Sequence, residues 1–126
     1  MEEEWTIRLD PDFDRSFRRW HKRHPESCDQ AVFRIQRYLE KWLNNPLLSH
    51  GFNHPGWIHH EGRGILAVDQ GGPSNLAEMR LYFWPDQDGR ELWLIRLGRK
   101  AHQYADIAYC HGWVERFKSG HGHAHD

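Results

Sequence analysis

The sequence predicts an α+β domain with an antiparallel sheet of about four strands, an amino-terminal helical hairpin on one face of the sheet, and a carboxy-terminal helix. Two observations predict it. Residues 76–97 have the composition and alternation of two strands joined by a turn. On either side of this region, apolar residues recur at the spacing of amphipathic helices. Consecutive strands joined by short turns pair antiparallel, which sets the expected strand direction.

The predicted hairpin is the part of the chain around which the rest is arranged. In its first strand, 76–84, Leu81 points to one face and Arg80 to the other. Pro85 ends this run, and the turn residues 86–89 contain an Asp-Gly pair, which tolerates positive φ. An arginine in the middle of a strand has to face something polar, so this face is a candidate functional face.

The second strand of the hairpin, 91–97, is aliphatic and aromatic except near its end. There Arg96 is followed by Gly98, Arg99 and Lys100, so a basic cluster closes the hairpin. We expect the function of the protein to reside at this end.

The other elements follow from helical spacing and from turn residues. Asp10 is a suitable helix cap and Pro11 suits the first helical position, while Pro25 separates two helices. The expected elements are a strand over 5–9, helices over 11–24 and 25–44, strands near 57–58 and over 64–69, and a helix over 101–117.

Length and composition indicate one domain. The chain has 126 residues, of which 38% are hydrophobic, and a formal net charge of −1, so overall charge does not indicate a nucleic-acid-binding protein. We expect a single domain over 1–118 and a flexible, His-rich tail over 119–126. The acidic amino terminus and the absence of long apolar runs predict no signal peptide, no membrane span and a cytoplasmic location. Cys28 and Cys110 are expected to be reduced, buried thiols.

The order of elements and the residues of the hairpin resemble the RelE/ParE toxin superfamily, in particular its RelE- and HigB-like members. The residues that carry the resemblance are Met79-Arg80-Leu81-Tyr82-Phe83, Asp88-Gly89-Arg90, Leu92-Trp93-Leu94-Ile95 and Gly98-Arg99-Lys100. The shared topology covers about 5–117, and the match of individual residues covers about 76–106. The resemblance implies the α+β fold described above.

The resemblance also implies an activity and partners. RelE-like proteins are toxins of toxin–antitoxin systems and act as ribosome-dependent mRNA endonucleases (mRNA interferases), without metal or other cofactor. Their expected partners are a cognate antitoxin, the ribosome and mRNA. The implied catalytic residues are Arg80, Lys100, Tyr104 and His102, with Asp106 or Tyr109 replacing Tyr104 in another register. The implied RNA-binding residues are Arg99, Arg96, Arg63 and His60.

One departure from the family pattern keeps two alternatives open. Members of this kind often carry Lys or Arg on the strand before the arginine strand, whereas 65–68 contain none. The runner-up keeps the fold and changes the target, as in a ParE-type toxin that inhibits DNA gyrase. A third reading is a non-catalytic binding module whose tail histidines, His121, His123 and His125, hold metal loosely. No spacing matches a structural zinc site, so we predict no built-in metal site.

Overall fold

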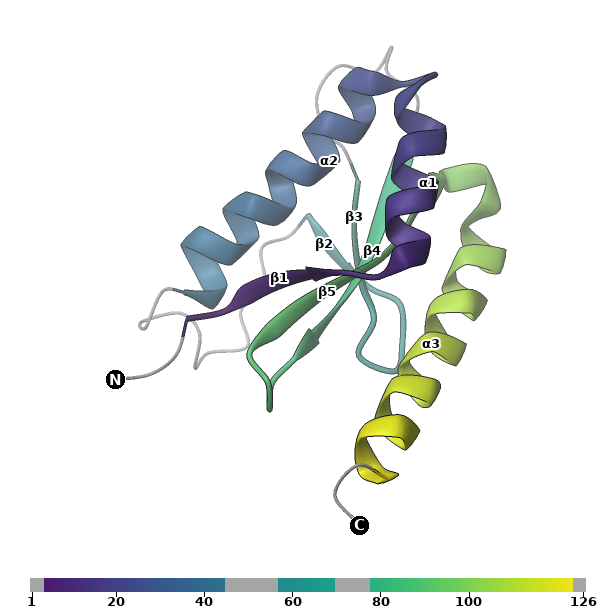
Figure 1. Cartoon of the computed structure of the whole chain (residues 1–126). Coiled ribbons are helices and arrows are strands. Elements are labelled where there is room, and N and C mark those ends of the chain that lie inside the picture. Colours follow the sequence, from purple (N-terminus) through teal and green to yellow (C-terminus); the bar gives the residue numbers. More distant parts are fainter. Residues whose placement is uncertain (1–3, 45–56, 70–77, 124–126) are drawn as a thin grey trace.

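The computed structural model describes residues 4–44, 57–69 and 78–123, with side chains up to 120 (Figure 1). Its elements occur in the predicted order. They are β1 (Thr6–Leu9), α1 (Pro11–His21), α2 (Pro25–Tyr38) with a π-helical turn (Leu39–Leu43), β2 (Ile58–His60), β3 (Leu66–Asp69), β4 (Met79–Asp86), β5 (Glu91–Arg99), a 3₁₀ turn (Lys100–His102) and α3 (Gln103–His123). The α+β class, the helical hairpin and the carboxy-terminal helix are confirmed.

The sheet differs from the prediction of about four antiparallel strands. The described strands form a five-stranded mixed sheet in the order β1-β5-β4-β3-β2, in which β1 runs parallel to β5 and the other neighbours are antiparallel. The rule for short turns applies only to β2 through β5. Because β1 leads into a helical hairpin, the chain crosses over before it returns to the sheet, and this crossover permits a parallel neighbour.

The sheet is covered on both faces. The α1–α2 hairpin packs on one face, where Ile35 and Tyr38 meet Leu81 and Phe83. Helix α3 packs on the opposite face, in a second cluster that includes Tyr82, Ile95, Cys110 and Val114. The two clusters confirm that Leu81 and its strand neighbours alternate between faces. Arg80 shares its face with Tyr82, so it lies on the α3 side.

A bulge in the β4–β5 pair determines which way the basic end of β5 points. Tyr82 lies opposite Arg96 and Phe83 opposite Leu94, so Ile95 is an extra residue. If the strand alternated strictly from Leu94, Arg96 and Gly98 would face the α1–α2 core. With the bulge, Leu97 takes the core position and Arg96 turns to the α3 side.

Helix α1 covers the edge of β5 that β1 leaves free. The Asp10 amide donates to the Leu94 carbonyl at 3.0 Å, and the Leu97 amide donates to the Ser16 hydroxyl at 3.0 Å. The Ser16 hydroxyl in turn donates to the Phe13 carbonyl at 2.9 Å. The predicted cap is confirmed, because the Asp10 carboxylate accepts from the Asp12 amide. As a result, α1 is fixed beside the last residues of β5.

Two element boundaries and one turn residue depart from expectation. Strand β4 continues through Pro85 to Asp86, and the positive φ of the turn belongs to Arg90, not to Gly89. Helix α3 runs to His123, into the segment expected to be a tail, whereas 76–77 and 124–126 lie outside the described residues.

Both cysteines are free and buried, as predicted, and burial raises the pKa of the Cys28 thiol to about 11. Over 4–44, 57–69 and 78–123, no helix is long and apolar enough to cross a membrane.

Candidate functional site

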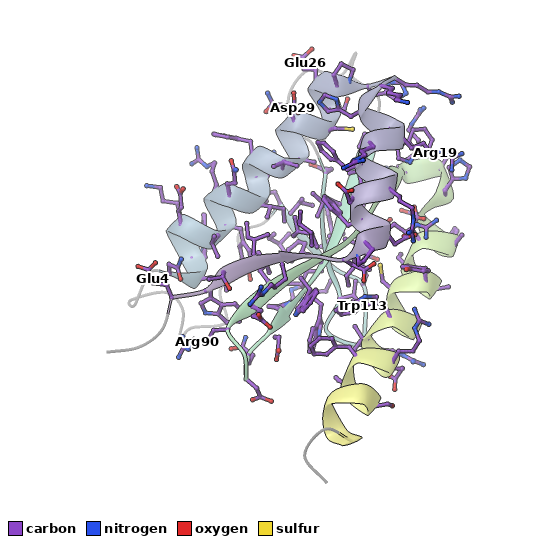
Figure 2. The ribbon with its side chains drawn as sticks, in the orientation of Figure 1. Glu4, Arg19, Glu26, Asp29, Arg90 and Trp113 are labelled. Carbon is purple, nitrogen blue, oxygen red and sulfur yellow. The ribbon has the colours of Figure 1, made fainter. Side chains whose placement is uncertain are left out.

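A cleft of about 490 Å³ opens between α1 and the start of α3, beside the last residues of β5. We call it the basic cleft. Its lining residues are Asp12, Arg15, Ser16, Arg19 and Trp20 from α1, Arg96, Leu97, Gly98 and Arg99 from β5, and His102, Ala105 and Asp106. Figure 2 shows Arg19 on α1, on the side of that helix where α3 begins. The cleft thus lies at the basic end of the hairpin.

Cations outnumber anions in the basic cleft. Four arginines line it, against two aspartates. Within the described part of the chain, Arg19 and Arg99 have no carboxylate partner. The Arg19 guanidinium lies 5.4 Å from the Trp20 ring centroid, and Arg99 Nη1 lies 3.4 Å from His24 Nε2. Guanidinium groups without a carboxylate partner are free to bind a phosphate in the bidentate geometry that suits them.

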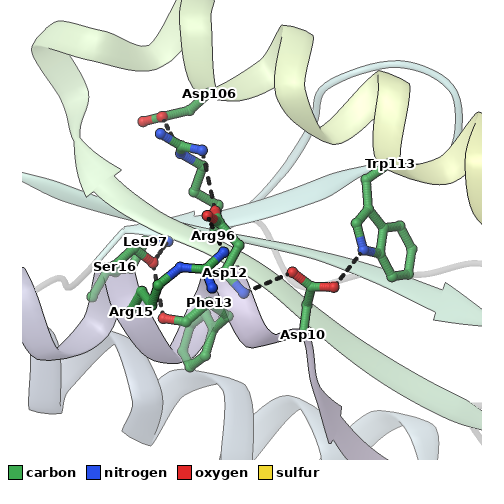
Figure 3. Close-up of polar contacts among 9 residues, drawn as sticks. All are labelled: Asp10, Asp12, Phe13, Arg15, Ser16, Arg96, Leu97, Asp106 and Trp113. Carbon is green, nitrogen blue, oxygen red and sulfur yellow. Dashed lines mark hydrogen bonds and ion pairs between the residues drawn. The ribbon is translucent and has the colours of Figure 1, made fainter.

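Arg96 connects the three walls of the cleft (Figure 3). Its Nε donates to Asp106 Oδ1 of α3 at 2.7 Å, and its Nη1 donates to Asp12 Oδ2 of α1 at 3.1 Å. Its guanidinium also lies 4.7 Å from the ring centroid of Tyr109. Asp12 takes a second ion pair, from Arg15 at 3.3 Å. Both carboxylates are therefore compensated, and Arg96 is held in one orientation by partners on two helices.

Asp106 is the buried acid of the cleft. Its side chain is only 5% exposed, and Oδ2 has no hydrogen-bond partner among the described residues. Burial raises its pKa above the ordinary value of 3.8, and the neighbouring Arg96 opposes this shift. Gly98 forms the floor beneath it, because a Cβ there would lie 2.2 Å from Asp106 Oδ2. A carboxyl with a raised pKa is suited to accept or release a proton at moderate pH.

The structure brings three of the predicted site residues together. Arg96, Arg99 and His102 all line the basic cleft. Asp106, which the family resemblance left as an alternative to Tyr104, lines it too. Tyr104 is 83% exposed and is not among the lining residues, so the register with Asp106 facing inward is the one the fold adopts.

The other predicted residues lie outside the cleft. Arg80 sits opposite Gly98 in the sheet, but its side chain is 14% exposed and pairs with Glu61 at 3.5 Å. Lys100 pairs with Glu78 at 3.5 Å, and Arg63 pairs with Glu115 at 3.2 Å. His60 is exposed on β2, at the sheet edge far from β5. The catalytic and RNA-binding roles of these residues, and of Tyr104, stay predictions.

The sequence did not predict that side chains of α1 would line the site. Asp12, Arg15 and Arg19 belong to what looks like the charged outer face of an amphipathic helix. Only the parallel pairing of β1 places that face beside β5. Gly98 carries one usable signal, because a glycine inside a strand often marks a close approach by another group. In the part of the chain that the structure describes, no three His, Cys, Asp or Glu side chains are grouped to hold a metal ion.

Comparisons with known proteins give little beyond this geometry. No protein-family model matches the sequence, and no curated protein matches it. A solved structure that is similar is the RelBE2 toxin–antitoxin complex from Mycobacterium tuberculosis, with a TM-score of 0.41 and 14% identity over 78% of this chain and 100% of that chain. At this level of likeness, the function has to be inferred from the cleft itself.

Proposed function

We propose that this protein is the toxin of a toxin–antitoxin system and acts as a ribosome-dependent mRNA endonuclease. The observation that carries the proposal is the basic cleft, which is lined by four arginines, a buried carboxyl, Asp106, and His102. This combination supplies both of the things that phosphodiester cleavage requires, namely fixed cations for the phosphate and groups that exchange protons.

The chemistry is an internal attack on the phosphate by the neighbouring 2′-hydroxyl. Asp106 accepts the proton of the 2′-hydroxyl as the new bond from the 2′-oxygen to phosphorus forms. The bond from phosphorus to the 5′-oxygen breaks, and His102 donates a proton to that leaving oxygen. The products are a 2′,3′-cyclic phosphate and a 5′-hydroxyl, and no metal takes part. Acid–base groups of this kind contribute about 10²–10⁴-fold each.

The arginines stabilise the charge that builds on the phosphate. Arg99 lacks a carboxylate partner among the described residues and borders the cleft, so it is the first candidate to bind the scissile phosphate. Arg96 is held by Asp106 and Asp12 and positions Asp106. Arg19, on the opposite wall, is placed to bind an adjoining phosphate.

The charge balance supports the dependence on the ribosome. With a net charge of −1, the protein as a whole does not attract RNA, and the basic cleft is a local gathering of four arginines. RNA presented and oriented by the ribosome removes the need for strong binding by the protein alone. An antitoxin that covers the same cleft with acidic side chains would neutralise the toxin.

Induction of the protein in bacteria tests the proposal. We expect growth arrest and new mRNA 5′ ends within translated regions, and both should disappear with Asp106→Asn. The control is Asp88→Asn, in the exposed hairpin turn, which should be as toxic as wild type. Growth arrest without new 5′ ends, together with loss of DNA supercoiling, would contradict the proposal and favour gyrase inhibition.

A further inference from the structure

A second groove adjoins the basic cleft and has a different character. It encloses about 730 Å³ between the start of α1, β5 and the middle of α3. Four aromatic side chains and two arginines form most of its lining: Trp93, Tyr109, Trp113, Phe117, Arg15 and Arg116. We call it the aromatic groove. Asp12 and Arg15 line both spaces, so the groove is continuous with the cleft.

We propose that the aromatic groove binds the bases of single-stranded RNA next to the phosphate held in the basic cleft. This inference rests on the proposed function and extends it to the recognition of the flanking strand. A groove that combines aromatic faces with arginines is the usual way in which proteins bind single strands, because bases stack on the rings while the cations follow the backbone.

The aromatic residues form a rigid surface whose outer faces are not fully buried. The rings of Trp113 and Phe117 stack with centroids 5.2 Å apart and an angle of 17°. Trp93 packs against both, at 5.6 Å and 5.4 Å. Trp113 is buried, whereas Trp93, Phe117 and Tyr109 are partly exposed. The buried tryptophan thus fixes rings that have area left for stacking with a ligand.

Two arginines of the groove are placed to contact a polyanion. Arg116 lies 5.9 Å from the Tyr109 ring centroid and has no carboxylate partner within the described residues, and Arg15 is 73% exposed. The aspartates of the lining already have partners within the protein. Asp10 accepts from the Trp113 indole at 2.8 Å and from the Asp12 amide at 2.9 Å, as Figure 3 shows. Asp12 is paired with Arg96 and Arg15.

Binding of fluorescent RNA by anisotropy tests the inference on the full-length protein. The ligands are a trinucleotide, which occupies the cleft alone, and a single strand of about 12 nucleotides, which reaches the groove as well. Arg116→Ala should weaken binding of the longer strand about 3- to 10-fold at low salt and leave the trinucleotide unchanged. Phe117→Leu should weaken it about 10-fold by removing a stacking face.

A matched control and the contrary outcomes complete the design. Arg18→Ala removes an equal charge from α1, where Arg18 pairs with Asp14 and borders neither space, and should bind both ligands as wild type does. Melting curves confirm that each variant is folded. Unchanged affinity of both groove variants for the longer strand would overturn the inference, as would equal binding of duplex RNA. In the first case, transcript cleavage in cells would leave the proposed function standing, and a protein partner would become the alternative occupant. RNA binding that depends on the groove, without any cleavage, would contradict the endonuclease activity and support the groove as an RNA-binding site.

Discussion

The carboxylate of Asp106 lies directly against the backbone of Gly98, so that a Cβ at position 98 would come within 2.2 Å of Oδ2. No side chain fits between α3 and β5 at this point. The contact brings the first turns of α3 down onto the basic end of β5 and places Asp106 beside Arg96.

Gly98→Ala should therefore disturb the site and the fold together. The added methyl group has to displace Asp106, which is held by Arg96, so we expect a loss of about 1–3 kcal/mol in the free energy of unfolding and a large loss of cleavage. The measurements are urea unfolding and single-turnover cleavage. The control is Gly120→Ala, since a Cβ there meets nothing within 4 Å. In the last turn of α3 this change should be neutral or slightly stabilising, and equal behaviour of the two variants would contradict the close contact.

The stability of the protein should depend on pH through Asp106. Because its pKa in the folded protein is raised above the ordinary value of 3.8, the folded state holds this proton more tightly than the unfolded chain does. The free energy of unfolding should then fall as the pH rises from about 3.8 through the raised pKa, and level off above it. Asp106→Asn should lack this component. Chemical unfolding of both proteins over this pH range checks it, and parallel pH profiles would refute the assignment.

Arg99→Ala should lower activity without lowering stability. The guanidinium is half-buried at the border of the cleft and lacks a carboxylate partner within the described residues. Losing it removes a cation aimed at the phosphate, and we expect about a 10²–10³-fold slower single-turnover cleavage of ribosome-bound mRNA. The control, Arg37→Ala on the exposed face of α2, should cleave at the wild-type rate. A normal rate for Arg99→Ala would place the phosphate elsewhere.

Arg80→Ala should lower the stability of the protein. A half-exposed strand arginine contributes little to folding, but Arg80 is 14% exposed and pairs with Glu61, which is 17% exposed. Its removal leaves that carboxylate largely buried without its cation, for a loss of about 1–3 kcal/mol. A double-mutant cycle with Glu61→Gln measures the coupling between the two. Zero coupling with normal stability would show that the pair is of no consequence to the fold.

Leu81→Ala should destabilise the domain most. Leu81 is fully buried in the core beneath the α1–α2 hairpin, and such truncations cost about 2–5 kcal/mol. Leu9→Ala is the matched control, because Leu9 is 54% exposed and should lose far less. Thermal melting compares them, and similar melting temperatures would show that the core has been assigned to the wrong face.

Local patterns in the sequence determine most of the secondary structure. The strand around Leu81 and the helices form where the spacing of apolar residues predicts them. Each element buries one face, so its apolar residues recur at the period of a strand or of a helix. Asp10 caps α1 as expected, since the cap depends only on neighbouring residues. The sequence also predicts the basic end of β5, and Arg96, Arg99 and His102 line one cleft there.

The tertiary structure decides what these residues face. Parallel pairing of β1 with β5 joins segments far apart in the chain, and it alone brings Arg15 and Arg19 to the cleft. The bulge at Ile95 reverses the direction of Arg96, which simple alternation would send into the core. The turn of α3 that faces inward is set by packing on the sheet, so Asp106 is buried and Tyr104 is exposed. Strand partners and helix rotation depend on contacts between distant residues, and a local pattern carries no information about them.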